Sequence, residues 1–102
     1  MTTGDTLATI TLHDEPVRLI EQAYANGRMA ISAVGADGSS WGTLTVNLPD
    51  VALADGEMAI KNWSENAEMA EAAMATGAFV DTGRTIRVNF VAAPVWTLRG
   101  RA

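Results

Sequence analysis

The chain contains no cysteine. It therefore forms no disulfide, offers no thiolate ligand to a metal ion and has no cysteine nucleophile. It also has no apolar run near the ~20 residues of a membrane-spanning helix, and its first residues lack a basic stretch followed by an apolar one. We therefore expect a cytoplasmic location, with which the lack of cysteine agrees.

Histidine is almost as scarce, because His13 is the only one. It stands beside Asp14 and Glu15, but transition-metal sites draw several His or Cys ligands from across a fold. A Ser-His-Asp triad would have to use His13, and no GxSxG sequence is present to hold the serine. The glycines of GADGSS and DTGRT lack the spacing of phosphate-binding loops. We therefore predict a surface histidine, no metal, no cofactor and no enzymatic activity.

Basic residues are few and unevenly placed. Seven Lys and Arg stand against twelve Asp and Glu, which gives a net charge of −5. Residues 50–81 hold seven acids and one base, whereas residues 82–102 hold four arginines and no acid. This asymmetry indicates either two faces with different partners or a C-terminal strand beside the acidic segment. Direct binding to nucleic acid is not expected, because it needs clustered Lys and Arg.

The chain does have short segments in which apolar and polar residues alternate, as in β-strands. At 102 residues, with 48% hydrophobic and 19% charged residues, it is predicted to form one globular domain over residues 1–102. The candidate strand segments are 8–13, 17–24, 28–34, 41–48, 57–63, 78–80, 85–90 and 95–99. We expect an α+β domain in which about six or seven strands form a mostly antiparallel, curled sheet with one partly polar face.

Glycine, asparagine and proline mark the predicted turns between these segments. Asn26-Gly27 is typical of a two-residue hairpin turn of type I′, which needs positive φ at both residues. Residues 81–84, Asp-Thr-Gly-Arg, are a second turn candidate. Pro94 is expected to separate the last strand from the one before it.

The six aromatic residues are scattered along the chain, and we predict that most of them lie in the core. Parity in the segment 85–90 places Ile86, Val88 and Phe90 on the inward face, with Arg87 and Asn89 on the outward one.

One segment has the features of a helix, from Ser64 to about residue 76. Ser64 suits the N-cap position, and glutamates near the start suit the positive end of the helix dipole. Gly77 suits the left-handed position that ends many helices. The apolar stripe of this helix consists of Ala67, Ala70, Ala73 and Met74.

The junction of residues 61–66, between the preceding strand and this helix, has two interpretations. In the structural one, Trp63 fills the core, Asn62 or Asn66 satisfies free backbone groups, and Ser64 caps the helix. In the functional one, carboxylates form an acidic ridge that binds a basic groove on another protein. The ridge consists of Glu65, Glu68 and Glu71, with Asp55 and Glu57 nearby in the sequence.

Four blocks of sequence, YANGRMAI, TLTVNLPD, IKNWSEN and DTGRTI in that order, resemble a family of short proteins of unknown function. Members of this family are common on plasmids, phages and integrated elements of bacteria. The resemblance covers residues 24–98 and carries no known activity. The positions that match the motifs are Arg28, Asn47, Lys61, Asn62, Ser64, Glu65 and Asn66.

The resemblance implies an accessory protein of a mobile element. Our leading hypothesis is a stoichiometric, protein-binding inhibitor of a bacterial defence system, of the anti-CRISPR or anti-restriction type, that blocks a nucleic-acid-processing effector. A second hypothesis is a non-catalytic interaction module for plasmid or phage maintenance, for which a homodimer formed through an exposed strand edge is one form. A third is a small-ligand binder or enzyme with a pocket in which Asn47, Asn62 and Arg87 converge.

Overall fold

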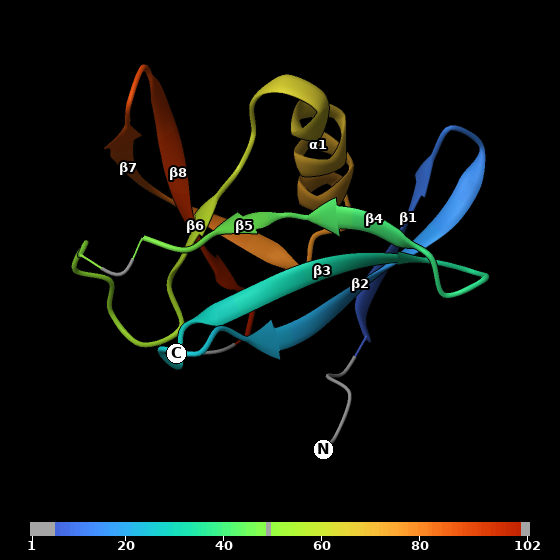
Figure 1. Ribbon diagram of the computed structural model, residues 1–102, viewed down its shortest axis with the longest axis horizontal. Helices are drawn as coiled ribbons and strands as arrows, with labels where there is room; N and C mark the ends of the chain where they lie inside the picture. The colour runs from blue at the N-terminus through green and yellow to red at the C-terminus, as the bar shows by residue number, and fades with distance from the viewer. Residues whose placement is uncertain (1–5, 49, 101–102) are drawn as a thin grey trace.

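The computed structural model describes residues 6–48 and 50–100 (Figure 1). These residues form eight strands in two four-stranded antiparallel sheets, together with one α-helix, α1, from Ala67 to Ala75. The structure confirms the predicted α+β class, the antiparallel pairing and the single helix. The strands are divided between two sheets, which the sequence analysis did not distinguish.

The first sheet is a meander in the order β1-β2-β3-β4. Alternation sets its two faces: Ile10 pairs with Val17 on the buried face, whereas Thr9 pairs with Arg18 on the exposed face. The outer face is therefore partly polar, as predicted. The strands are β1 (Thr6–Leu12), β2 (Glu15–Ala23), β3 (Met29–Gly35) and β4 (Ser40–Thr43).

The second sheet has the order β5-β6-β8-β7. Its strands are β5 (Thr45–Val46), β6 (Met58–Ile60), β7 (Phe79–Val88) and β8 (Val91–Leu98). β6 is buried along its whole length because it lies between β5 and β8. β7 and β8 form a long hairpin whose turn extends away from the two sheets, at the upper left of Figure 1.

Leu44 joins the two sheets. Its N–H donates to the carbonyl of Ile31 in β3, and its carbonyl accepts from the N–H of Lys61 beside β6, each at 2.8 Å. The predicted strand 41–48 is therefore divided into β4 and β5, which pair with different sheets. The chain bends at Leu44, whose side chain is fully buried.

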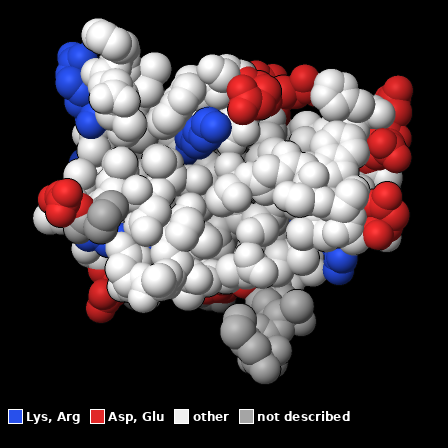
Figure 2. Space-filling model, in the orientation of Figure 1, with Lys and Arg blue, Asp and Glu red and all other residues white. Residues whose placement is uncertain are grey.

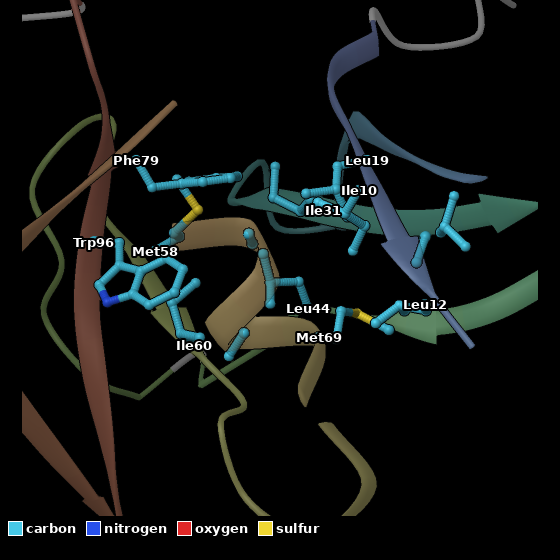
Figure 3. Close-up of a cluster of buried hydrophobic side chains, with 14 of the residues drawn as sticks. Ile10, Leu12, Leu19, Ile31, Leu44, Met58, Ile60, Met69, Phe79 and Trp96 are labelled. Atoms are coloured by element: carbon cyan, nitrogen blue, oxygen red, sulfur yellow. The ribbon is translucent and has the colours of Figure 1, made fainter. Parts of the chain in front are cut away.

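The core lies between the two sheets and α1 (Figure 3). α1 packs against β1 and β7, and its buried residues are Met69, Ala70 and Ala73. The small alanines let the helix approach closely, so the predicted apolar stripe is largely confirmed, although Ala67 itself is exposed. On the side of the second sheet, the rings of Phe79 and Trp96 lie 5.5 Å apart in a tilted arrangement.

Two predicted turns have a different geometry. Gly27 has φ of 85°, but Asn26 is not in the positive-φ region. The carbonyl of Tyr24 accepts from Gly27, and the Tyr24 N–H donates to Arg28, so residues 25–27 form a three-residue loop with a left-handed glycine. The predicted type I′ turn is therefore wrong in its type, although the hairpin between β2 and β3 exists.

Residues 81–84 form a bulge inside β7, not a turn between two strands. Asp81 pairs with Trp96 and Thr85 pairs with Pro94, so β7 holds three residues between these pairs where β8 holds one. Thr82 fastens the bulge, because its hydroxyl donates to the carbonyl of Val95 at 2.8 Å. Pro94 is tolerated within β8 at this irregular site. It does not separate two strands as predicted.

Two further hairpin turns have two residues each. His13 and Asp14 have φ of 51° and 64° and join β1 to β2, the geometry of a type I′ turn in a place that the sequence analysis did not identify. Asn89, with φ of 55°, and Phe90 join β7 to β8. Phe90 is therefore at the tip of a hairpin and fully exposed, and its predicted inward orientation is wrong.

Candidate functional site

Three glutamates lie on the exposed side of α1 and of the 3-10 turn (Ser64–Asn66) that precedes it. They are Glu65, Glu68 and Glu71, which we call the acidic helix edge. Their spacing of three residues places them along one side of the helix. All three are exposed, and no Lys or Arg occurs between Lys61 and Arg84 to neutralise them. Acidic side chains gather over α1 and toward the end that carries the β1–β2 turn, whereas the basic ones are scattered, one group of them at the β7–β8 hairpin (Figure 2).

The glutamates differ in their neighbours. Glu65 lies 3.5 Å from the ammonium of Lys61, one turn earlier. A hydrogen bond from its own backbone N–H, together with the charge of Lys61, holds the pKa of Glu65 below its ordinary value. Glu68 and Glu71 make no hydrogen bond or ion pair with the residues that the structure describes. Two of the three carboxylates are therefore available to a cation from outside the molecule.

α1 separates two hollows, and the acidic helix edge contributes to both. The first, which we call the turn hollow, has a volume of about 180 Å³ and lies between the start of α1 and the β1–β2 turn. His13 and Trp41 form one of its walls, with ring centroids 6.1 Å apart in a stacked arrangement. Its lining residues are Leu12, His13, Trp41, Glu65, Asn66, Glu68 and Met69. Two carboxylates thus stand beside two aromatic rings, a combination that suits a cationic side chain.

The second hollow, which we call the helix groove, is wider, about 610 Å³, and lies between α1 and the β7–β8 hairpin. Glu71 borders it from the helix and Asp81 borders it from β7. Its apolar residues include Met74, Pro94 and Trp96. The indole Nε1 of Trp96 is buried and has no hydrogen-bond partner among the described residues, which is uncommon for a buried donor.

Asp55 and Glu57 do not belong to the acidic helix edge, although we predicted them beside it. They precede β6, in a segment that lies below β5 in Figure 1, whereas α1 lies above it. Glu57 binds Arg84 at 2.8 Å and also accepts the N–H of Ala54. This N–H, and then the nearby guanidinium, lower the pKa of Glu57. Asp55 is exposed and borders a third hollow, with Arg28.

The pairing of Arg84 with Glu57 also tests the charge asymmetry of the sequence. It shows a basic residue of the C-terminal segment lying against the acidic one, as one of the two interpretations predicted. Arg87 behaves differently, because it is exposed and makes no hydrogen bond or ion pair with any described residue. Arg99 donates to the carbonyl of Gly77 at 2.6 Å, and Arg101 lies outside the described residues. The basic hairpin is therefore only partly neutralised from within.

Several motif residues have structural roles. Arg28 donates through its two terminal nitrogens to the carbonyls of Leu48 and Val51, which fastens the segment after β5. Asn47 accepts from the side chain of Asn26 at 3.1 Å. These bonds tie the β2–β3 turn to the chain that follows β5.

The junction of residues 61–66 is organised by Asn66. This side chain is 5% exposed, and its Nδ2 donates to the carbonyl of Thr43 at 2.7 Å, as the structural interpretation proposed for an asparagine here. Ser64 does not cap α1: it has φ of 56° and begins the short 3-10 turn from Ser64 to Asn66. Asn66 holds the N-cap position, without a side-chain cap bond. Trp63 is only half-buried and is not part of the core.

Neither a metal site nor the proposed convergence of polar groups is found in the described part of the chain. No three His, Asp or Glu side chains within residues 6–48 and 50–100 are placed to hold a metal ion. Asn62 borders the helix groove, Asn47 bonds to the β2–β3 turn, and Arg87 lines no described hollow. None of the hollows described above is lined by all three residues.

Sequence reasoning missed the two aromatic features of the surface. The contact between His13 and Trp41 joins residues far apart in the chain, and no local pattern in the sequence indicates it. Phe90 was assigned by strand parity, which fails where a turn begins. The sequence Asn89-Phe90 between two apolar residues did offer a signal, because Asn tolerates positive φ in hairpin turns.

Comparisons of the chain with protein-family models, with curated proteins and with solved structures found no match. Among the described residues, no helix is both long and apolar enough to cross a membrane.

Proposed function

We propose that this protein acts without catalysis, by binding a protein partner at the acidic helix edge. The observation that carries the proposal is the set of exposed carboxylates on α1, two of which have no cation within the described chain. The natural counterpart is a surface rich in Lys and Arg. Opposite charges on two surfaces speed their encounter and select the partner, more than they add affinity.

The turn hollow gives this edge a shaped anchor point. A Lys or Arg side chain of the partner enters beside Trp41 and His13 and meets Glu65 and Glu68. An aromatic face attracts a cation, and a carboxylate next to it gives the cation a charged hydrogen-bond partner. A partner with a single protruding basic side chain therefore binds here more tightly than one with a flat basic surface.

The specific form of the proposal is an inhibitor of a bacterial defence system, acting in the cytoplasm. Proteins that cut or bind nucleic acid carry basic grooves, which an acidic edge complements. The resemblance of the sequence blocks to proteins of mobile elements supports this class of partner. The inhibitor covers the basic groove of the effector in a one-to-one complex and is not consumed. Inhibition therefore saturates when the concentrations of inhibitor and effector are equal.

A phage-plating assay tests this function. Bacteria that carry a defined restriction or CRISPR system are challenged with a targeted phage, with and without the protein. We expect the wild-type protein to raise the plating efficiency, and the variant Glu65→Gln/Glu68→Gln/Glu71→Gln to lose most of this effect. Pull-down of the effector should weaken at least about tenfold in the same variant, because three charges are removed from the contact.

The matched control removes the same charge elsewhere. Asp37→Asn/Asp50→Asn/Asp55→Asn changes three exposed acids that line neither the turn hollow nor the helix groove, and should bind as the wild type does. Equal loss in both variants would show that net charge, and not this surface, matters. If no defence system in the panel is affected by the wild-type protein, the inhibitor form of the proposal is wrong.

A further inference from the structure

The tip of the β7–β8 hairpin presents a large apolar side chain to water. Phe90 is 99% exposed, and it is the one large hydrophobic residue in the described chain that is exposed. Aromatic residues are enriched among the residues that anchor protein interfaces, where they fill a pocket on the partner. A ring at the end of a two-stranded ribbon is placed for such an insertion.

The charged residue nearest to this ring in the sequence is basic. Arg87 lies just before the turn, is exposed and has no partner among the described residues. No acidic residue occurs after Asp81 in the chain. The hairpin tip therefore combines an apolar ring with a free positive charge. Its counterpart must be an apolar hollow with an acidic border.

The helix groove has this character. Met74, Pro94 and Trp96 supply its apolar surface, and Glu71 and Asp81 supply two negative charges at its border. No Lys or Arg lines it. Its volume of about 610 Å³ leaves room for one aromatic side chain and part of the turn that carries it.

The groove is not filled by the hairpin of its own molecule. Phe90 is fully exposed and does not line the groove, although Asp81 and Pro94 at the base of the same hairpin do. The hairpin is thus one wall of the groove, and its tip points away from the body of the molecule (Figure 1). Among the described residues, the tip of this hairpin therefore does not occupy the groove.

We propose that a second copy of this chain fills this groove: Phe90 and Arg87 of each protomer insert into the helix groove of the other, opposite Glu71 and Asp81. Because each hairpin forms a wall of its own groove, a two-fold axis between two hairpins brings each tip to the partner's groove at once. Such a contact is self-complementary and closes as a dimer. It combines a central aromatic anchor with charge pairs at the rim.

This inference does not depend on the proposed function. The turn hollow lies on the other side of α1, so Glu65 and Glu68 stay free in the dimer. Glu71 belongs to both surfaces, so the variants that separate the two proposals are Glu65→Gln/Glu68→Gln for effector binding and Phe90→Ser for self-association.

Sedimentation equilibrium of the full chain at low salt, from about 1 to about 100 μM, tests the dimer. We expect the mass to rise from monomer to dimer over this range. Phe90→Ser should weaken the dimer at least about 30-fold, because it removes the anchor. Circular dichroism should show an unchanged fold, since this side chain is almost fully exposed. A wild-type chain that stays monomeric, or a Phe90→Ser chain that stays dimeric, would overturn the proposal.

An exchange of charges tests the proposed pairing of Arg87 with Glu71 and leaves Phe90 unchanged. Arg87→Glu places a negative charge against Glu71 and Asp81, so we expect about tenfold weaker association. Combining it with Glu71→Arg should restore the dimer to within about threefold of the wild type. If Arg87→Glu leaves the dimer unchanged, this arrangement of the two hairpins is wrong.

The absence of native cysteine allows a direct test of the contact. Phe90→Cys and Ala67→Cys are made in separate chains, where Ala67 is an exposed residue of the helix groove. Mild oxidation of the mixture should give a disulfide between the two chains. Phe90→Cys mixed with Ala36→Cys, an exposed residue of the β3–β4 turn, is the control and should give little. Equal yields in both mixtures would overturn the proposal.

Discussion

Two hairpins that close with two-residue turns stand at opposite ends of the molecule, and they differ in what their tips touch. Both turns use non-glycine residues with positive φ, His13 and Asp14 in one and Asn89 in the other. At the β1–β2 turn, His13 stacks on Trp41 of β4, beside the start of α1. At the β7–β8 turn, the Phe90 side chain is almost fully exposed in the described part of the chain.

The difference shows that a turn and its surroundings are decided separately. The local chain sets the backbone of both tips, since a two-residue turn needs positive φ. Whether the side chain at the tip is held depends on a neighbour from elsewhere in the fold. The β1–β2 tip, which we call the held tip because His13 stacks on Trp41, belongs to the turn hollow. The β7–β8 tip, which we call the free tip, carries the exposed Phe90 that we propose as an anchor. Four sets of variants test how the surroundings of the two tips contribute to stability.

The largest loss of stability is expected at Gly35, which packs against Trp41 of the held tip. A Cβ at Gly35 would lie 2.7 Å from Nε1 of Trp41, so Gly35→Ala must displace the indole. We expect a loss of about 3 kcal/mol in the free energy of unfolding, the upper end for overpacked sites. Urea denaturation measures it. In a Trp41→Leu background the cost of Gly35→Ala should fall by more than half, and an equal cost would show that Trp41 is not the obstacle.

The next largest effect concerns Asn66, which borders the turn hollow and ties it to β4. Asn66→Ala removes the bond from the buried Asn66 side chain to the carbonyl of Thr43 and leaves a space where the amide was. We expect a loss of about 2 kcal/mol. Asn62→Ala is the matched control, since Asn62 is exposed, and should change stability by less than about 0.5 kcal/mol. Equal effects of the two variants would contradict this role for Asn66.

The two turns themselves should respond differently to glycine. Asp14→Gly should stabilise the protein by about 0.5 kcal/mol, because glycine adopts positive φ without strain and suits the second position of a type I′ turn. Asn89→Gly should have almost no effect, since asparagine already tolerates this region. Thermal unfolding of both variants measures the contrast. A clear loss of stability in Asp14→Gly would mean that its carboxylate makes a needed contact.

The smallest effect is a pH dependence at the base of the free hairpin. Bonding lowers the pKa of Glu57 below its ordinary value near 4.5, so the ionised form stabilises the fold above that pH. This contribution is lost as the pH falls through the lowered pKa. Glu57→Gln should therefore cost less than about 0.5 kcal/mol near neutral pH, and progressively less as the pH falls below the ordinary pKa of the carboxyl group.

Denaturation curves at several pH values measure this difference. Glu68→Gln, whose carboxylate makes no bond with the described residues, is the control and should show little change between these conditions. A Glu57→Gln penalty that is constant with pH would show that the loss comes from packing and not from the ionised carboxylate.

The sequence by itself determined the secondary structure of much of the chain. Alternation in segments such as 8–13 and 17–24 is a local property, because successive strand residues point to opposite faces. The helix after residue 63 and its row of glutamates are equally local, since a period near 3.6 places them on one side. Composition also fixed the class of domain, because a chain with this share of apolar residues buries a core.

Only the tertiary structure decided how these elements form surfaces. Leu44 divides a predicted strand because its N–H and carbonyl pair with two different sheets. Glu57 is not part of the predicted acidic ridge. Its carboxylate lies 2.8 Å from the guanidinium of Arg84, a residue far along the chain. Trp41 reaches His13, and the helix groove opens beside Phe90's own hairpin, through packing of distant segments. Such contacts depend on which segments meet in space, and local periodicity carries no information about that.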